Sequence, residues 1–286
     1  MKKSIVHFFV WVAIAVGAVQ GAPVYRTFTN TEGQTIQARI IQYDEVGDRI
    51  LIERKDGKNK DWAALSMFSK SDQEYIQEWI AADLVLNEKS LLVDIDKKSE
   101  NMESDVDYTF VAPRGASTGT WERAEASRLD REEVHYQLRL KNSGSDDIKN
   151  IKIEYCIYLV NDSGGRRLNS GSVTNGVIEL GGLSKDHYKA TETQEVITSK
   201  YYERRYVSTY DSTGAKKSSS YLAKISEVEV EGIWIRITGP ELEGLPVVRD
   251  VYYPRGFEKK GYQWNSTTKI LEKDKNDVGG FVWDRL

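Results

Sequence analysis

The chain has few of the residues that build metal centres and disulfide scaffolds. Its 286 residues include one cysteine and three histidines. The single cysteine, Cys156, cannot close an intramolecular disulfide, and the separated His135 and His187 cannot complete a Cys/His zinc site with it. Cys156 lies in the run IEYCIYL. This pattern predicts a small buried side chain rather than a reactive thiol.

The motifs of common catalytic and nucleotide-binding sites are also missing. No P-loop or Gly-x-Gly-x-x-Gly follows a predicted strand, and there is no Gly-x-Ser-x-Gly elbow. Composition alone does not rule out a Ser–His–Asp triad. Paired carboxylates of the glycosidase type are inevitable by chance among forty-four acidic residues. We therefore expect no catalytic residue, no cofactor and no metal centre.

A calcium site is the one metal site that the acidic residues suggest. Glu103, Asp105 and Asp107 lie close together in an irregular segment, and calcium needs several converging oxygen ligands. Their spacing does not match an EF-hand loop, so a solvated strand face is the simpler interpretation.

The charge pattern gives little drive towards nucleic acid. The formal net charge is −4, and acidic and basic residues are interspersed, whereas nucleic-acid binding normally needs a concentrated basic face. The chain has only five prolines but sixteen tyrosines and seven tryptophans. Aromatic residues favour strands, and the length suffices for two domains.

Residues 1–21 have the pattern of a signal peptide. Lys2 and Lys3 precede an almost wholly apolar run, and Val19 and Gly21 suit the small-residue subsites of a signal peptidase. An uncleaved N-terminal anchor is the alternative. No second apolar run approaches the length of a spanning helix. We expect an exported protein, periplasmic or extracellular, that has no membrane segment after cleavage.

Residues 23–86 predict a small β-rich module that ends in one helix. Residues 35–43 alternate as a half-buried strand does, residues 50–52 start a second strand, and Asp56-Gly57 is a strong hairpin signal before a third strand through Trp62. Ser71 and Glu74 fit a capping box. After the capping box, apolar residues recur at helical spacing: Tyr75, Ile76, Trp79 and Ile80. This stripe either packs the helix against the strands or forms a surface for a partner.

This module resembles the Sla-one homology domain, an SH3-like barrel. The resemblance covers under a quarter of the chain. It rests on Phe28-Thr29, Gly33, Ala38, Asp56-Gly57, Leu65-Ser66, Asp72 and Tyr75, the last four residues in the arrangement Leu-Ser-x5-Asp-x2-Tyr. A proline often found before Leu-Ser is replaced by Trp62-Ala63-Ala64. The resemblance implies recognition of short Asn-Pro-Phe-x-Asp peptides, as in eukaryotic adaptors that link cargo to clathrin and actin.

SH3-like barrels bind extended peptides in aromatic-lined grooves. On this ground Tyr43, Arg54 and Trp62 are the candidate peptide-binding residues of the module. The alternative for each of them, which is the simpler interpretation, is a place in the core or on a solvated surface.

Residues 88–286 predict a larger β domain after the polar break Asn87–Ser90. Residues 133–140 and 151–158 alternate around a turn at Lys141–Asp147, which resembles the central hairpin of an immunoglobulin-like or fibronectin-type sandwich. Turn signals separate further strand candidates at 177–180, 189–197, 200–209, 221–225, 228–237 and 247–253.

Two segments of this domain are candidate contact surfaces. The tyrosine-rich stretches around Tyr201–Tyr206 and Ser220–Leu222 flank Asp211–Gly214 and predict a long hairpin, in which Tyr and Arg are residues favoured at binding hot spots. The C-terminal GGFVWDRL either packs back on the domain or pairs with the edge of another chain.

The sequence therefore predicts a mainly β protein, a small SH3-like barrel with one C-terminal helix followed by an immunoglobulin- or fibronectin-like β-sandwich. The expected function is non-catalytic binding or scaffolding, with a peptide or protein partner and possible self-association through exposed edges. The alternative is a hydrolase, or the accessory protein of one, that acts on envelope polysaccharide or peptide.

Overall fold

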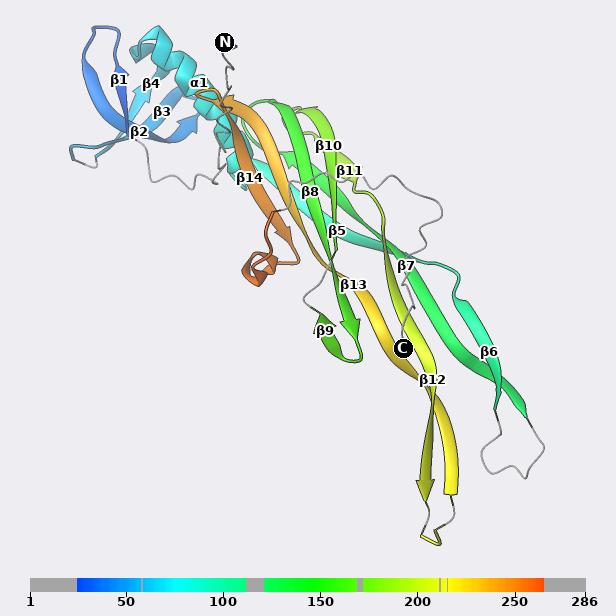
Figure 1. Ribbon diagram of the computed structural model, residues 1–286. Coiled ribbons are helices and arrows are strands. Elements are labelled where there is room, and N and C mark those ends of the chain that lie inside the picture. Colours follow the sequence, from blue (N-terminus) through cyan, green and yellow to red (C-terminus); the bar gives the residue numbers. More distant parts are fainter. Residues whose placement is uncertain are drawn as a thin grey trace, which may run out of the picture. The chain divides into compact units, whose positions relative to one another are not determined.

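The protein is mainly β, with antiparallel sheets and one α-helix in the described part of the chain (Figure 1). The computed structural model describes residues 25–57, 59–111, 121–168, 172–210, 212–214 and 216–264. The predicted leader and the C-terminal GGFVWDRL lie outside these residues. The chain divides into two compact units, Met1–Ile76 and Gln77–Leu286.

The first unit contains a four-stranded sheet. Its strands follow chain order and pair antiparallel: β1 (Arg26–Thr29), β2 (Thr35–Asp44), β3 (Arg49–Arg54) and β4 (Lys60–Ala64). The 3-10 turn η1 (Leu65–Met67) leads to helix α1 (Lys70–Leu86). The strands predicted from alternation and from the Asp56-Gly57 turn are confirmed.

Helix α1 begins two residues earlier than the sequence suggests. Ser69 Oγ accepts the backbone N–H of Asp72 at 3.3 Å, and the carbonyl of Ser69 accepts the N–H of Gln73 at 2.9 Å. Ser69 is therefore the N-cap, because its hydroxyl satisfies an N–H of the first turn. The predicted capping box of Ser71 and Glu74 is wrong.

The core of the first unit lies between the sheet and the start of α1. Phe28 of β1 packs against Phe68 and Tyr75, with ring centroids 5.6 Å and 6.0 Å apart, and Ile50 and Ile76 are fully buried. Tyr75 and Ile76 thus seal the helix against the strands, which was one of the two interpretations of the apolar stripe.

The second unit contains one ten-stranded antiparallel sheet. Its strands are β5 (Leu91–Asn101), β6 (Asp105–Val111), β7 (Glu122–Asn142), β8 (Ile148–Ser163), β9 (Arg166–Leu168), β10 (Val173–Leu183), β11 (Tyr188–Glu192), β12 (Val196–Tyr210), β13 (Lys216–Leu242) and β14 (Leu245–Tyr253). The main path runs β10-β8-β13-β12-β7-β11. Strand β14 pairs with β13, β5 and β6 pair with β7, and β9 pairs with β8.

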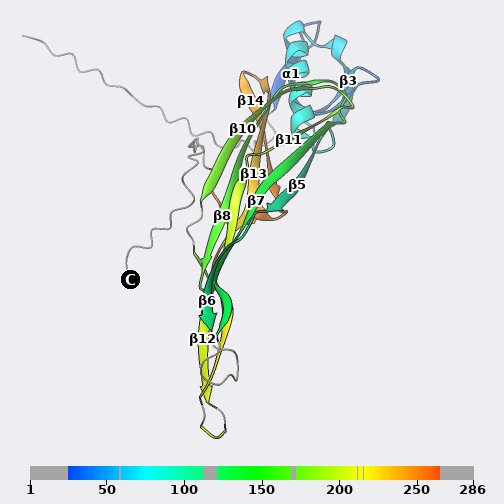
Figure 2. The same ribbon diagram turned by 90° about the vertical axis from the view of Figure 1, so that its right-hand side faces the viewer.

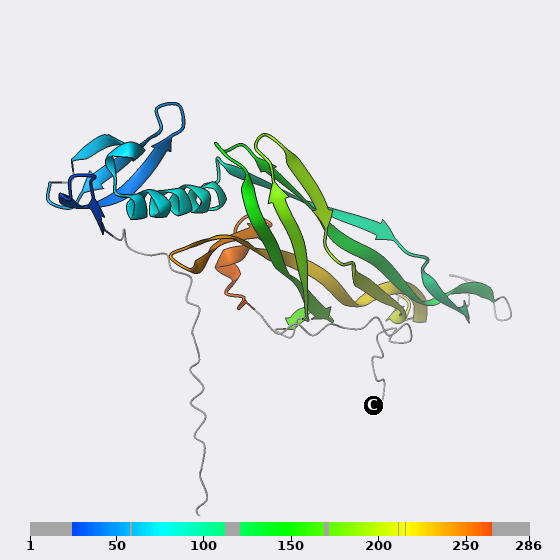
Figure 3. The same cartoon turned by 90° about the horizontal axis from the view of Figure 1, so that it is seen from above.

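The sheet curls, so that strands far apart along this path share one core (Figure 3). Inward-facing residues alternate along β7, β8 and β13, and they meet side chains from the C-terminal half of α1. This core contains Ala82, Leu84, Val85, Leu91, Val134, Tyr136, Leu138, Leu140, Ile148, Ile151, Ile153, Tyr155, Ile157, Leu159, Leu183, Val196, Ile233, Ile235, Ile237 and Val247. The sequence places a boundary at Asn87–Ser90, whereas the compact units divide inside α1.

The predicted hairpin of residues 133–140 and 151–158 is not formed. Strand β7 pairs with β5, β6, β11 and β12, whereas β8 pairs with β9, β10 and β13. The two strands face each other across the core instead. In the connection between them, Asn142 donates side-chain N–H groups to the carbonyls of Asp146 and Leu183 at 2.8 Å and 3.0 Å. These bonds tie the end of β7 to the following turn and to the end of β10.

Three predicted strand boundaries are also wrong, one of them the expected break between residues 197 and 200, which lies inside β12. The expected strand 189–197 is broken between β11 and β12, because Thr193 Oγ1 takes the N–H of Tyr136 at 2.9 Å in place of a ladder carbonyl. The expected break between residues 225 and 228 does not exist. Strand β13 runs through it with a bulge at Ile225, opposite Tyr201 and Tyr202.

A second, smaller cluster covers the outer face of β8 and β13. After β14, the 3-10 turn η2 (Phe257–Lys260) brings Phe257 onto Tyr158, with ring centroids 5.3 Å apart. Tyr158 Oη donates to the carbonyl of Gln263 at 2.8 Å, and Cys156 is fully buried beside them. The prediction that Cys156 is a buried apolar side chain is confirmed.

Candidate functional site

The sheet of the first unit has one face that is turned away from its core. Leu51 lies opposite Trp62 in the register of β3 and β4, and the buried Ile50 points to the other side. Trp62 is 41% exposed, and the guanidinium carbon of Arg49 lies 4.8 Å from the centre of its ring. Arg49 Nε also donates to Asp44 Oδ2 at 2.7 Å. We call Arg49, Leu51 and Trp62 the outer face of the first unit.

Next to Trp62, a buried carboxylate stabilises the same outer side of the sheet. Glu53 is 7% exposed and accepts bonds from Arg39 Nη2 at 3.0 Å and from Tyr25 Oη at 3.1 Å, with Lys60 Nζ 4.0 Å away. The hydrogen bond from Arg39 holds the pKa of Glu53 below its usual value. Arg39, Arg49 and Lys60 outnumber the carboxylates that they contact, Glu53 and Asp44, by one positive charge.

The three predicted binding residues do not share a face. Tyr43 lies opposite the buried Ile50, and Arg54 lies opposite the buried Ala38, so both belong to the core side of the sheet. Trp62 alone lies on the outer face.

Tyr43 and Arg54 are each engaged by a nearby aspartate. Tyr43 Oη donates to Asp48 Oδ1 at 3.2 Å. Arg54 makes a two-pronged contact with Asp56 at 2.8 Å and 3.2 Å. The sequence analysis did not identify Arg49 and Leu51 as surface residues beside Trp62. The period-two alternation of a strand places both on the side of Trp62 once Ile50 and Ile52 are known to point inward.

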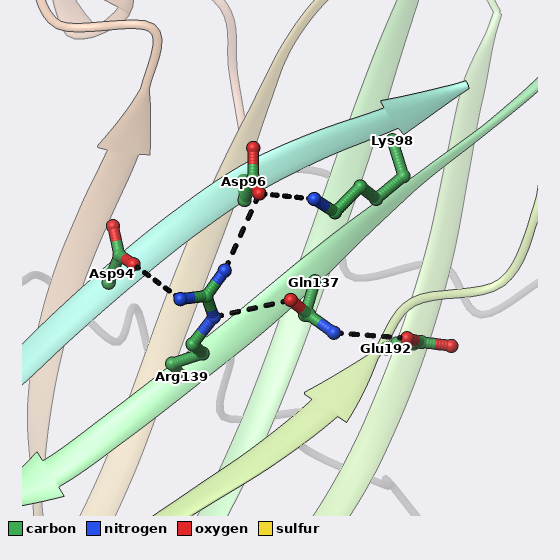
Figure 4. Close-up of polar contacts among 6 residues, drawn as sticks. All are labelled: Asp94, Asp96, Lys98, Gln137, Arg139 and Glu192. Atoms are coloured by element: carbon green, nitrogen blue, oxygen red, sulfur yellow. Dashed lines mark hydrogen bonds and ion pairs between the residues drawn. The ribbon is translucent and has the colours of Figure 1, made fainter.

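A network of charged side chains lies on the outer face of β5, β7 and β11 in the second unit (Figure 4). Arg139 of β7 reaches across to β5, with Nη1 3.8 Å from Asp94 Oδ2 and Nη2 3.5 Å from Asp96 Oδ2. Its Nε donates to Gln137 Oε1 at 3.2 Å, and Gln137 Nε2 donates to Glu192 of β11 at 3.3 Å.

Each charged side chain of this network contacts another side chain of the network, through an ion pair or, for Glu192, a hydrogen bond from Gln137. Asp96 is also 2.5 Å from Lys98 Nζ, and this hydrogen bond lowers the pKa of Asp96. The side chain of Arg139 is 47% exposed, and exposed ion pairs contribute little to stability. The network links side chains of three neighbouring strands and has the character of a solvated strand face.

A more buried set of charges lies where β12 and β13 pair. Glu227 is 5% exposed and contacts Lys224 Nζ and, at 3.3 Å, Lys200 Nζ. Burial opposes ionisation of Glu227, but the hydrogen bonds of Lys224, Glu229 and Lys200 outweigh it and lower its pKa. The hydrogen bond to Glu227, together with burial, raises the pKa of Glu229.

This carboxyl pair does not have the geometry of a glycosidase. The two carboxyl groups of Glu227 and Glu229 are hydrogen-bonded to each other. Retaining and inverting enzymes keep their carboxyl groups about 5 to 10 Å apart, with the scissile bond between them. The arrangement gives the alternative hydrolase function no support.

The acidic segment around Asp105 does not assemble a calcium site in the described part of the chain. Asp105 Oδ2 lies 2.5 Å from Arg131 Nη1, and Asp107 accepts the hydroxyl of Ser127 at 3.0 Å. Among the described residues, no three His, Cys, Asp or Glu side chains converge as metal ligands would. Nor does any helix within those residues have the length and apolar character to span a bilayer.

Comparisons with known proteins show no family. No family of proteins matches the sequence, and no curated protein matches it. One similar solved structure is described as "X-ray structure of Northeast Structural Genomics Consortium target SoR45", with 10% identity and a TM-score of 0.19 over 48% of this chain and 83% of that chain.

Proposed function

We propose that the protein is an exported, non-catalytic binding protein whose first unit recognises a peptide segment of a partner. In this proposal the first unit is an SH3-like barrel of the Sla-one homology kind. The second unit is an immunoglobulin- or fibronectin-like sandwich that acts as a spacer or a second recognition surface. The single observation that carries the proposal is the exposed Trp62 with the Arg49 guanidinium over its ring.

The outer face of the first unit suits a short peptide that has an aromatic and an acidic residue. A tryptophan ring offers a large apolar surface to a phenylalanine side chain. The guanidinium of Arg49 has N–H donors beyond the Nε that binds Asp44, and these match a carboxylate. The Asn-Pro-Phe-x-Asp peptides implied by the family resemblance contain both groups.

Strand β4 adds a backbone component to the same surface. It is the last strand in the order β1-β2-β3-β4, and in the described part of the chain no strand pairs with its outer edge. An extended peptide that adds to a sheet edge gains main-chain hydrogen bonds, and side-chain contacts then provide specificity. A peptide added to β4 would pass beside Trp62.

Isothermal titration of the full chain with a synthetic Asn-Pro-Phe-x-Asp peptide tests the proposal. Trp62→Ala is expected to weaken binding about tenfold or more, because aromatic anchors dominate such interfaces. Trp121→Ala is the matched control, since Trp121 is 65% exposed in the second unit. Peptides with Ala in place of Phe or Asp are expected to bind weakly. Equal affinity of Trp62→Ala and the unmodified protein, or no binding by either, refutes the assignment.

A further inference from the structure

The outer part of the β12–β13 hairpin is a free-standing two-stranded ribbon (Figures 1 and 2). Strand β12 pairs with β7 only as far as Glu203, and β13 pairs with β8 only from Ser226 onward. Between Arg204 and Leu222, the described residues of the two strands form ladder pairs only with each other. We call residues 204–222 the outer hairpin, and the long hairpin predicted from the sequence is confirmed.

The outer hairpin exposes both of its faces. None of its described residues is buried. A ribbon of two strands is at best marginally stable in water, so folding of the second unit does not by itself require this extension. Its surface is therefore the part of the unit best placed to have a role other than stability.

One face of the outer hairpin is a row of tyrosines separated by serines. Tyr206 lies opposite Ser220, Ser208 opposite Ser218, and Tyr210 opposite Lys216. Tyr206 is 63% exposed and Tyr210 is 72% exposed. They are four residues apart on one strand face, about 13 Å. The rings stand above small hydroxyl side chains, which leave room for a ligand between them.

The outer hairpin is basic in a chain that is acidic as a whole. Residues 204–222 contain four Lys or Arg and one Asp, whereas the formal net charge of the chain is −4. Arg204 is committed in part, since its guanidinium donates to the carbonyl of Glu125 and to Ser220 Oγ. Lys216 is exposed opposite Tyr210 on the Tyr206–Tyr210 face, and Arg205 is exposed opposite Tyr221 on the other face. A ligand that complements this surface carries negative charge.

We propose that the outer hairpin binds an acidic polysaccharide along the Tyr206–Tyr210 face. Tyrosines provide rigid, amphipathic surfaces on which sugar rings stack, and serines provide adaptable hydrogen bonds to sugar hydroxyls. Lys216, which lies opposite Tyr210 on the same face, then neutralises carboxylates of the polymer by charge-assisted hydrogen bonds. The site is in the second unit and does not depend on the peptide-binding role proposed for the first.

The same chemistry fits nucleic acid less well. Duplex DNA carries about one negative charge per 1.7 Å, and its binding relies on many basic side chains arranged along a face. The outer hairpin has few basic residues within a chain of negative net charge, so a densely charged polymer is repelled by the remainder of the surface. A polymer with carboxylates on separate sugars, and hydroxyls between them, matches the spacing of tyrosine, serine and lysine better.

Affinity electrophoresis of the full chain in native gels tests the proposal. The gels contain polygalacturonate or its fully methyl-esterified form, which has the same backbone without the charge. Polygalacturonate is expected to retard the protein, and the ester to retard it less. The double variant Tyr206→Ser/Tyr210→Ser is expected to bind about tenfold or more weakly.

Matched variants and competitors make the result specific. Tyr188→Ser removes a 74% exposed tyrosine from β11 and is expected to bind as the unmodified protein does. Lys216→Ser is expected to weaken binding and its salt dependence, whereas Lys141→Ser on β7 is not. Three results each overturn the proposal: no retardation by polygalacturonate, the same loss with Tyr188→Ser as with the double variant, or equal competition by duplex DNA of the same total charge.

Discussion

The carboxylate of Asp72 accepts the backbone N–H of Thr29 at 2.7 Å and so joins the first turn of α1 to β1. Ser69 Oγ donates to the same carboxylate oxygen at 2.9 Å, and Arg26 Nε lies 3.7 Å from the other oxygen. Asp72 is 4% exposed, so these groups replace the water that a carboxylate normally binds. The aspartate is thus a tertiary link as well as a favourable charge at a helix N-terminus.

Loss of the Asp72 carboxylate should loosen β1. We expect Asp72→Ala to lower the free energy of unfolding of the first unit by about 2 to 3 kcal/mol, because the part-buried N–H of Thr29 loses its acceptor. Hydrogen exchange of the β1 amides measures this directly. Glu74→Ala, which removes an exposed carboxylate from the same helix, is the control. Unchanged protection of Thr29 in Asp72→Ala would contradict the interpretation.

Gly232 is expected to tolerate no side chain. A Cβ atom there would lie 2.5 Å from Phe257 Cδ2 and 2.6 Å from the carbonyl oxygen of Tyr253. Gly232→Ala should therefore cost about 1 to 3 kcal/mol of stability, measured by urea unfolding. Gly182→Ala is the control, since its nearest atom would be the Ile148 carbonyl oxygen at 3.5 Å. Similar midpoints for the two variants would show that the segment after β14 moves aside freely.

The Glu227–Glu229 pair predicts a pH-dependent stability. Because the pKa of Glu229 is raised above its ordinary 4.5, the folded protein binds this proton more tightly than the unfolded chain does. The contribution of Glu229 to stability is therefore present below pH 4.5 and is lost as the pH rises through the folded pKa.

Glu229→Gln keeps a neutral side chain at every pH and tests this sign. Its unfolding free energy relative to the unmodified protein should increase as the pH rises from 4.5. Denaturation series at several pH values measure the trend. Glu203→Gln, on the exposed part of β12, controls for the loss of one negative charge. A difference that is constant with pH would exclude the raised pKa.

The thiol of Cys156 should be unreactive in the folded protein. It is fully buried under Phe257 and Tyr158, and a thiol reagent needs access to the sulfur. We expect no reaction with a chromogenic disulfide reagent until the protein is unfolded in denaturant. Ser218→Cys on the exposed outer hairpin provides a fast-reacting reference. Reaction of Cys156 at a comparable rate would show that the segment over β8 opens readily.

The sequence predicts strands well wherever one face is buried. The alternation of apolar and polar residues predicts β2 and much of β7 and also which of their side chains point inward. A period of two identifies the side of a strand that faces a core. Asp56-Gly57 fixed the turn before β4 through its own backbone preferences. The same alternation in residues 151–158 correctly predicts that the side chain of Cys156 is buried.

Alternation does not report which strand pairs with which. The alternation of β7 and β8 predicts a hairpin, yet β13 and β12 lie between them in the sheet. The contacts of Asn142 with the carbonyls of Asp146 and Leu183 are not visible in the sequence pattern. The outer face of the first unit shows the same limit. Trp62 was identified as an aromatic candidate, but its partner Arg49 became evident only from the register of β3 and β4.

The outer hairpin can change its length without disturbing the fold. No described residue of the core lies between Arg204 and Leu222, so insertions and deletions there are not constrained by packing. Removing two residues from each strand would shorten its reach by about 7 Å and keep the remaining side chains on their faces, whereas removing one from each would reverse them. Evolution can therefore adjust how far this arm extends in paired steps while the chemistry at its surface is retained.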